Sequence, residues 1–335
     1  MTVKITIIGL GQIGSSLGLA LAKHKDQITT LGHDKSPEIA RSAQKLGAVE
    51  SISYNLPASV EKADVIVMAI PFDQIHETLR IIAPDLRQNA VVLDTSPVKS
   101  AVTTWAKELL LSGCHYLGLT PALNPACLEI SAQGLEAARS DLFEKAVIAI
   151  TAPQGTAEGA LKLAADLVVL VGAQPFFADL VEMDGVMASA HLLPEICAAA
   201  LTETVTTQPG WSDIRKLAGK PFSFATQPLD GEGPAAISES VFQNRTNTLR
   251  VLDEYLAVLS SLRNEISDEN KKGLQDRFEH ASQARARWQL ERYKGDWREV
   301  EFGRSELPKI GDILKQQVGG LDKLFSRRAR KPGEE

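Results

Sequence analysis

Short apolar runs alternate with helical patterns along the first half of the chain. The runs are apolar at nearly every position and rich in β-branched residues, and they read VKITIIG, ITTLGHD, ADVIVMAIP, NAVVLDTS, HYLGLTP and KAVIAIT. Most are separated by segments with helical spacing, including helices expected to begin near Pro37 and Val98. Strands that are buried on both faces and separated by helices predict an α/β fold with a doubly wound, mostly parallel sheet.

The second half of the chain shows helical spacing and few β-rich runs. Its helical segments are 180–206, 234–266 and 268–294, and the Gly- and Pro-rich stretch after the first of them is expected to contain loops. The change near Gln174 predicts a sheet domain over 1–173, an all-helical domain over 174–300, and a surface helix with a solvated basic tail over 301–335. One apolar stripe indicates a helix packed either within the domain or across a two-fold axis, and it consists of Val241, Leu249, Leu252, Leu256, Leu259 and Leu262.

Composition narrows the possible partners. A net charge of -6 with 44% hydrophobic and 23% charged residues is typical of a soluble globular protein and gives no basic excess for nucleic acid. The chain has no uninterrupted apolar run long enough to span a membrane, so no membrane contact is expected. Cys114, Cys127 and Cys197 are odd in number and lie in apolar surroundings, which favours reduced thiols in a cytoplasmic protein. No metal site is predicted.

The segment IIGLGQIGSSLG predicts a dinucleotide-binding loop. Gly9, Gly11 and Gly14 have the G-x-G-x-x-G spacing between a predicted strand and a predicted helix. The first glycine allows the tight turn, the second admits the pyrophosphate, and the third lets the helix pack on the strand. The diphosphate is then expected at the helix N-terminus, beside Gln12 and Ile13.

Two further segments extend this predicted cofactor site. Asp34 closes the second strand twenty residues after Gly14, where a carboxylate accepts hydrogen bonds from ribose hydroxyls and repels a 2′-phosphate. NAD is therefore favoured, and NADP stays possible because the polar residues around Asp34 could soften the preference. Ile70 and Pro71 either lie along the cofactor toward the nicotinamide ribose or simply end a strand.

Six segments together resemble the prephenate and arogenate dehydrogenases of tyrosine biosynthesis. They are GLGQIGSSLGLAL, GHDKSPEIARSAQKLGAVES, ADVIVMAIP, DTSPVK, DLFEKAVIAIT and VMASAHLLPEICAAAL, and the resemblance covers most of residues 1–265. It implies a Rossmann domain, a helical dimerisation domain, and a homodimer that oxidises a small anionic substrate, a cyclohexadienol carboxylate, with NAD or NADP. In that reaction hydride leaves the ring carbon that bears the hydroxyl, carbon dioxide departs, and the ring becomes aromatic.

The sequence departs from the family at the two turns that handle the ring hydroxyl. The family's D-x-x-S-V-K turn reads DTSPVK, so Pro97 replaces the serine and Ser96 lies one place earlier. The family's H-P-M-A-G turn aligns with TPALN, so Thr120 replaces the histidine. Threonine can donate or accept a hydrogen bond but is no general base, a loss that typically costs about 10²- to 10⁴-fold in rate.

His191 is the first candidate to replace the missing base. The family's S-H-L-P-H pattern corresponds to AHLLPE, which keeps His191 and Pro194 and places Glu195 near the final histidine. Alternatively, His191 is a histidine satisfied within the core. His115, five residues before Thr120, is a second candidate.

Polar residues of both domains are candidate substrate contacts. Thr120, Asn124 and Ser96 form either a hydrogen-bonding pocket or a structural turn built by two prolines. Lys99 either reaches the substrate or caps a helix start. Asn244 either matches a family asparagine or is a surface amide.

A cation is retained where family members bind a substrate carboxylate. Their arginine corresponds to Lys216 in GWSDIRKLA, with Arg215 at a neighbouring threonine position. A lysine binds a carboxylate as a point charge rather than through two parallel hydrogen bonds, so an anionic substrate remains expected with altered geometry.

Three functional hypotheses follow. The first is a prephenate or arogenate dehydrogenase with a rebuilt proton relay. The second is a dehydrogenase of the same fold that acts on a different anionic hydroxy or amino substrate, and the third is a non-catalytic dinucleotide-binding dimer. The β-hydroxyacid dehydrogenases share the N-terminal motif, but their G-x-x-x-K-x-x-x-N helix is missing around DLVEMDGVMASAHLLPE.

Overall fold

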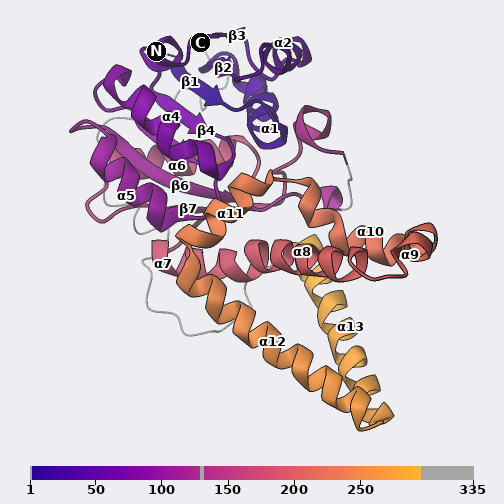
Figure 1. Ribbon diagram of the computed structural model, residues 1–335. Coiled ribbons are helices and arrows are strands. Elements are labelled where there is room, and N and C mark those ends of the chain that lie inside the picture. Colours follow the sequence, from indigo (N-terminus) through magenta and orange to yellow (C-terminus); the bar gives the residue numbers. More distant parts are fainter. Residues whose placement is uncertain (1, 129–131, 296–335) are drawn as a thin grey trace, which may run out of the picture. The chain divides into compact units, whose positions relative to one another are not determined.

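An eight-stranded sheet forms the first part of the chain in the computed structural model, which describes residues 2–128 and 132–295 (Figure 1). The strand order is β3-β2-β1-β4-β5-β6-β7-β8. The strands are β1 (Val3–Ile8), β2 (Ile28–His33), β3 (Ser51–Ile52), β4 (Val65–Met68), β5 (Val91–Asp94), β6 (His115–Pro121), β7 (Val147–Thr151) and β8 (Gln174–Phe177). Neighbouring strands are parallel except for β6 and β7, which are antiparallel. The predicted doubly wound, mostly parallel sheet is confirmed.

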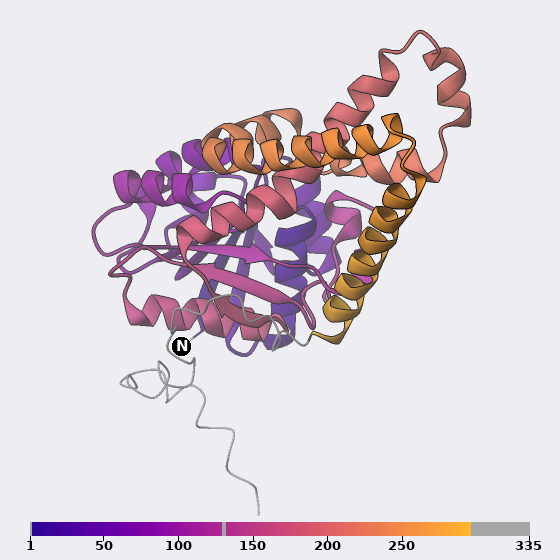
Figure 2. The same ribbon diagram turned by 90° about the horizontal axis from the view of Figure 1, so that it is seen from below.

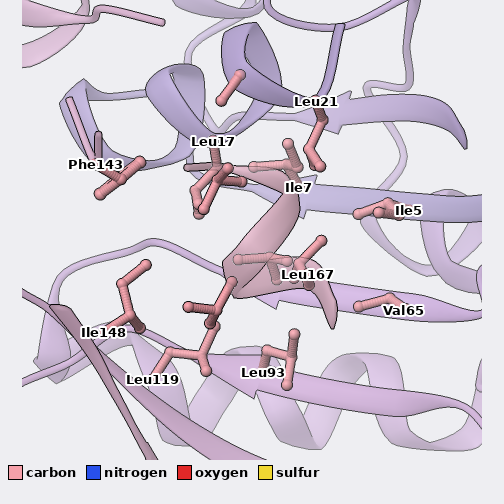
Figure 3. Close-up of a cluster of buried hydrophobic side chains, with 14 of the residues drawn as sticks. Ile5, Ile7, Leu17, Leu21, Val65, Leu93, Leu119, Phe143, Ile148 and Leu167 are labelled. Carbon is pink, nitrogen blue, oxygen red and sulfur yellow. The ribbon is translucent and has the colours of Figure 1, made fainter. Parts of the chain in front are cut away.

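Helices cover both faces of the sheet because successive side chains of a strand point to opposite sides. They are α1 (Gln12–Leu21), α2 (Pro37–Leu46), α3 (Leu56–Val60), α4 (Ile75–Ile82), α5 (Lys99–Leu109) and α6 (Glu158–Leu170), with short turns η1 (Ala22–His24), η2 (Phe72–Gln74), η3 (Ala83–Asp85), η4 (Pro125–Cys127) and η5 (Gly134–Ala137). Ile5, Ile7 and Leu93 belong to the core shared with α1, α2 and α6 (Figure 3). Ile66 and Met68 belong to the core shared with α3, α4 and α5.

The described chain after β8 is helical (Figures 1 and 2). Its elements are α7 (Leu180–Met187), the π-helical turn η6 (Ala188–Leu192), α8 (Leu193–Thr206), α9 (Trp211–Leu217), α10 (Lys220–Thr226), the turn η7 (Gln227–Asp230), α11 (Pro234–Gln243), α12 (Arg245–Ser267) and α13 (Lys271–Lys294). This part contacts the sheet part mainly where α7 packs on α5 and α11 packs on η2. Those contacts lie where the chain leaves β4 and β5, and the contact of α7 with α5 is next to Ser96, one of the predicted site residues.

The structure departs from the sequence expectations in several elements. Strand β8 pairs with β7, so the sheet continues four residues past the expected boundary at residue 173. The helix expected over 234–266 breaks at Asn244, which separates α11 from α12. In the single chain Leu249, Leu256 and Leu259 are 41–51% exposed, so this part of the stripe is not buried within the domain. The helix and basic tail expected over 301–335 lie outside the described residues.

The continuous helical segment Leu180–Thr206 is long and apolar enough to cross a membrane, judged by length and composition alone. It contains no uninterrupted apolar run of that length, because its apolar residues are interspersed with ionisable ones. Two of these, Asp184 and Glu195, are buried within the chain. Carboxyl groups are rare in membrane spans, and the segment also packs against α5, α11 and α12.

Candidate functional site

The carboxyl ends of four strands meet at one edge of the sheet. The parallel register aligns Ile8 of β1 with Met68 of β4, Met68 with Asp94 of β5, and Asp94 with Gly118 of β6. The segments that follow these positions therefore share one edge: the glycine loop, the turn through Pro71, the turn after Asp94, and the last residues of β6. In open α/β sheets, ligands bind at this edge.

The glycine loop has the geometry of a dinucleotide-binding turn. Gly9 has a φ of +89°, and a Cβ there would lie 2.3 Å from the carbonyl oxygen of Ala69. A Cβ on Gly14 would lie 1.9 Å from the carbonyl oxygen of Gly9, whereas one on Gly11 would meet no atom within 4 Å. Gly11 is therefore open to an approaching ligand. It also precedes α1 without a side-chain cap, so the first backbone N–H groups of the helix can bind an anion.

Asp34 is hydrogen-bonded to the glycine loop. Its Oδ2 atom accepts a hydrogen bond from the Leu10 N–H at 2.9 Å, and its Oδ1 atom accepts one from the Ser36 N–H at 2.8 Å. A carboxylate oxygen has two lone pairs, so each oxygen can still accept a ribose hydroxyl. Asp34 is half-buried at the end of β2, which fits its predicted role.

The remaining predicted cofactor residues lie on the same edge. Gln12 and Ile13 begin α1 and are half-buried. Ile70 and Pro71 follow β4, and the Cγ2 atom of Ile70 would lie 2.7 Å from a Cβ on Gly9. Ile70 therefore packs beside the loop expected to receive the pyrophosphate.

Lys99 does not reach a substrate. Its side chain is fully buried, and its Nζ donates to the Asp94 carbonyl at 3.0 Å, to Asp94 Oδ2 at 3.0 Å and to the Leu119 carbonyl at 2.9 Å. Burial lowers the pKa of Lys99, while Asp94 opposes that shift. Since the three ammonium donors all have protein acceptors, the predicted substrate contact is wrong and Lys99 is a buried structural cation.

The turn after Asp94 is held by this buried group. Asp94 Oδ1 accepts from the Ser96 N–H at 2.7 Å, and Asp94 Oδ2 also accepts from the Tyr116 hydroxyl at 2.9 Å. Burial and the adjacent carboxylate raise the pKa of Tyr116 well above its ordinary value, so the phenol stays protonated as a donor. Ser96 is buried, and its Oγ donates to the Val98 carbonyl at 3.3 Å.

Thr120 and Asn124 differ in whether their side chains already have hydrogen-bond partners in the protein. The Thr120 Oγ1 atom is buried and has no hydrogen-bond partner among the described residues. Asn124 instead closes its own turn, because its Oδ1 accepts from the Ala126 N–H at 3.1 Å and its Nδ2 donates to the Asp141 carbonyl at 3.0 Å. Asn124 is therefore part of a structural turn, as the second alternative predicted, and not the expected substrate contact.

His191 lies in the π-helical turn η6. Pro194 has no N–H, and its ring would clash with the Ala190 carbonyl in a regular α-helix, so the turn opens just before it. The family spacing S-H-L-P-H has one residue between histidine and proline where this chain has two, and a π-turn accommodates one additional residue. His191 and Glu195 are four residues apart and therefore neighbours along the helix, with His191 Nε2 3.6 Å from Glu195 Oε1.

Burial favours the neutral forms of both groups. His191 Nε2 is buried and has no hydrogen-bond partner among the described residues, and burial lowers the pKa of His191. Glu195 is 5% exposed, and burial together with the charge of Glu232 raises its pKa to about 8. Glu232 precedes α11, and burial and the charge of Asp73 in η2 raise its pKa too. At neutral pH the pair is thus an unprotonated imidazole beside a largely protonated carboxyl.

Three other predicted residues, His115, Arg215 and Lys216, lie away from His191 and Glu195. His115 is the first residue of β6, at the amino end of the strand, about 16 Å from Thr120 at ~3.3 Å per residue. Arg215 and Lys216 are exposed on α9, and Lys216 Nζ pairs with Asp213 Oδ1 at 2.8 Å. Helix α9 follows the end of α8 opposite His191 (Figure 1), and α8 is about 21 Å long at ~1.5 Å per residue. Within one chain these residues therefore do not lie in the same site as His191.

Asn244 is neither a substrate contact nor a surface amide. It is 5% exposed, its Nδ2 donates to the Asp184 carbonyl at 2.7 Å, and its Oδ1 accepts from Asn247 Nδ2 at 2.9 Å. Asp184 was not among the predicted residues, nor were Glu232 and Asp73. The only sequence signal for Asp184 is an acidic residue two turns before His191 on the same predicted helix.

Comparisons with known proteins agree with this architecture. The prephenate dehydrogenase nucleotide-binding domain matches residues 17–176, and the prephenate dehydrogenase dimerization domain matches residues 181–280. The chain is similar to prephenate dehydrogenase of Bacillus subtilis, with 26% identity over 84% of this chain and 75% of that protein. It is also similar to cyclohexadienyl dehydrogenase of Zymomonas mobilis, with 25% identity over 84% of this chain and 94% of that protein.

A solved structure shows the same fold. It is prephenate dehydrogenase from A. aeolicus in complex with hydroxyphenyl propionate and NAD+, and it aligns with a TM-score of 0.74 at 21% identity. The alignment covers 86% of this chain and 98% of that one. The likeness therefore includes the sheet part and the helical part together.

Proposed function

The chain belongs to the prephenate and arogenate dehydrogenase family, and from that premise we propose that it oxidatively decarboxylates a cyclohexadienol carboxylate, with His191 and Glu195 handling the hydroxyl proton. Family membership makes it an NAD-dependent oxidoreductase, so the non-catalytic dimer is not proposed. The observation that carries the proposal is the unpartnered His191 Nε2, 3.6 Å from a buried carboxyl.

The proposed proton transfer follows from the chemistry of the ring. As hydride leaves the hydroxyl-bearing carbon, the hydroxyl proton becomes acidic and moves to the neutral imidazole of His191. Glu195 keeps its own proton, and its carboxyl oxygen 3.6 Å from His191 Nε2 stabilises the imidazolium through the partial negative charge of that oxygen. When the carboxylate leaves as carbon dioxide, its bonding electrons aromatise the ring and the proton returns to the phenolic oxygen.

The residues of the glycine loop fit NAD. The open approach at Gly11, the uncapped start of α1 and the half-buried Asp34 match a pyrophosphate followed by an unphosphorylated ribose. Bound NAD supplies the hydride acceptor. The chain's own contribution is to hold the ring beside β4 and β5, with Thr120 Oγ1 as a hydrogen-bonding group at the carboxyl edge. Ser96 Oγ donates to the Val98 carbonyl, so toward a substrate it can act only as an acceptor.

We also propose a cytoplasmic homodimer. The chain contains a dimerization domain, and the exposed residues Leu249, Leu256 and Leu259 form an apolar stripe along α12 that a second copy can cover. Any substrate role for Arg215 and Lys216 then requires that second copy, because α9 lies at the far end of α8. The three cysteines are free thiols, which agrees with a reducing compartment.

A second candidate function is a dehydrogenase for a different anionic hydroxy or amino substrate. Thr120 and Pro97 favour it, because both stand where the family keeps the residues for the ring hydroxyl. The two functions differ in the substrate that is oxidised. Only a prephenate or arogenate dehydrogenase forms NADH from prephenate or arogenate.

The role of His191 is tested by His191→Asn, with His115→Asn as the matched control at the opposite edge of the sheet. We expect His191→Asn to reduce kcat by about 10²-fold or more while NAD binding is unchanged, and His115→Asn to leave kcat unchanged. Parent activity should persist below the ordinary histidine pKa, because burial lowers the pKa of His191 and keeps the imidazole unprotonated. A His191→Asn enzyme with parental kcat at every pH would remove His191 from the reaction.

A further inference from the structure

Asp184 joins the helical part of the chain to the first turn of α5. It lies in α7, is 4% exposed, and accepts hydrogen bonds from the Lys99 N–H at 2.6 Å and the Ser100 N–H at 3.1 Å. Helix α5 has no side-chain cap of its own, because its N-cap residue is Val98. A carboxylate from 85 residues further along the chain therefore supplies the cap, where the helix dipole favours negative charge.

Lys99 transmits this contact to the carboxyl edge of the sheet. Its backbone N–H binds Asp184, while its Nζ binds Asp94 Oδ2 and the carbonyl of Leu119. Leu119 directly precedes Thr120, and the other carboxylate oxygen of Asp94 holds the Ser96 N–H. Lys99 thus connects α7, through its backbone N–H, to both turns that stand where the family handles the ring hydroxyl, through its buried ammonium group.

The other side of Asp184 is fixed to the junction of α11 and α12. The Asn244 amide donates to the Asp184 carbonyl at 2.7 Å, and Asn247 in turn holds the Asn244 side-chain oxygen at 2.9 Å. His191 follows Asp184 by seven residues on the same continuous helical segment, which passes from α7 into the π-helical turn η6. The rotation of that segment about its axis sets where His191 and Glu195 lie.

We propose that Asp184 is a positioning residue that fixes His191 of the helical part against the Ser96 and Thr120 turns of the sheet part. The expected change in kcat rests on the proposed function, whereas the expected change in hydrogen exchange is independent of it. Loss of the Asp184 carboxylate should loosen the start of α5, because the Lys99 and Ser100 N–H groups lose their acceptor. It should also loosen the π-helical turn, because the segment that carries this turn loses those hydrogen bonds to the sheet part and keeps only the bond from Asn244 to the Asp184 backbone carbonyl.

The test compares Asp184→Ala and the milder Asp184→Asn with Asp179→Ala. Asp179 is a matched control on the same helix, because it caps α7 itself through the Val181 and Glu182 N–H groups and makes no bond to α5. Hydrogen exchange is measured on peptides covering 97–105 and 188–196, alongside the Kd for NAD, kcat and KM. Exchange and NAD binding are measured without substrate.

Asp184→Ala should increase exchange in both peptides and lower kcat about tenfold or more, with the Kd for NAD within about twofold of the parent. Asp184→Asn keeps one acceptor oxygen and should fall between Asp184→Ala and the parent, and it is decisive if the alanine variant does not fold. Asp179→Ala should leave both peptides and kcat at parental values. Unchanged exchange at 188–196 in Asp184→Asn, or parental kcat in a folded Asp184→Ala, would overturn the proposal. A parent without turnover would refute the proposed function and leave the exchange result to decide the role of Asp184.

Discussion

Replacing Glu195 with glutamine removes a buried ionisable group with little change of shape. Glu195 is 5% exposed, and burial and Glu232 raise its pKa to about 8 from an ordinary 4.5. Between these two pH values the folded protein binds a proton that the unfolded chain releases. The stability of the parent should therefore fall as pH rises from about 4.5 to about 8, whereas glutamine has no proton to lose.

The size of this effect follows from the pKa difference. At ~1.4 kcal/mol per pH unit, the difference between about 8 and 4.5 corresponds to about 5 kcal/mol when Glu195 is fully ionised. Between about pH 5.5 and pH 8.5, Glu195→Gln should gain roughly 3 kcal/mol of unfolding free energy relative to the parent.

Urea unfolding at about pH 5.5, 7 and 8.5 measures this gain, at one fixed protein concentration because a dimer's stability depends on concentration. Glu203→Gln is the control, since Glu203 is exposed on the same helix and its difference from the parent should stay constant with pH. If the difference between Glu195→Gln and the parent were also constant, Glu195 would not be a buried proton carrier beside His191.

Three other changes test separate parts of the structure. Asp34→Asn should weaken NAD binding about tenfold and NADP binding less, measured by fluorescence titration, because it removes the charge that binds ribose hydroxyls. Lys99→Met should lower the unfolding free energy by about 3–5 kcal/mol in urea, because it leaves the Asp94 carboxylate buried without its cation. Leu256→Asp should shift the protein from dimer to monomer in sedimentation velocity, because Leu256 is 51% exposed in the single chain and a dimer would bury it. Parental behaviour in any of these assays would contradict the role given to that residue.

The sheet and the glycine loop could be predicted from sequence because their signals are local. Apolar runs separated by helical spacing identify a parallel sheet, and the spacing of Gly9, Gly11 and Gly14 identifies a turn whose steric needs the structure reproduces. Two short strands, β3 and β8, gave too little pattern to predict. The break at Asn244 was also missed, since apolar spacing continues across it.

The polar residues near the site were harder to assign, because distant partners decide their roles. Lys99 and Asn244 are both fixed by Asp184, 85 and 60 residues away in the sequence, and Asn124 is fixed by Asp141. Each could face a substrate when only its own turn is considered. The structure shows instead that their hydrogen bonds end on protein groups, which leaves His191 Nε2 and Thr120 Oγ1 as unpartnered buried atoms among the predicted site residues that the structure describes.

The position of His191 shows what a sequence motif alone omits. Its extra spacing from Pro194 resembles an alignment shift in the sequence, whereas the structure absorbs it in a π-helical turn. His191 Nε2 lies there 3.6 Å from Glu195 Oε1. Sequence reasoning placed Glu195 near the family's final histidine but gave no sign that it would be buried. The proposed proton relay depends on that burial.

Formation of NADH from NAD and of NADPH from NADP, each assayed with prephenate and with arogenate, tests the central claim most directly. We predict turnover with at least one of the two substrates, faster with NAD than with NADP, together with loss of turnover in His191→Asn but not in His115→Asn. NAD binding without NADH formation from either substrate would contradict the account and favour a dehydrogenase for another anionic substrate.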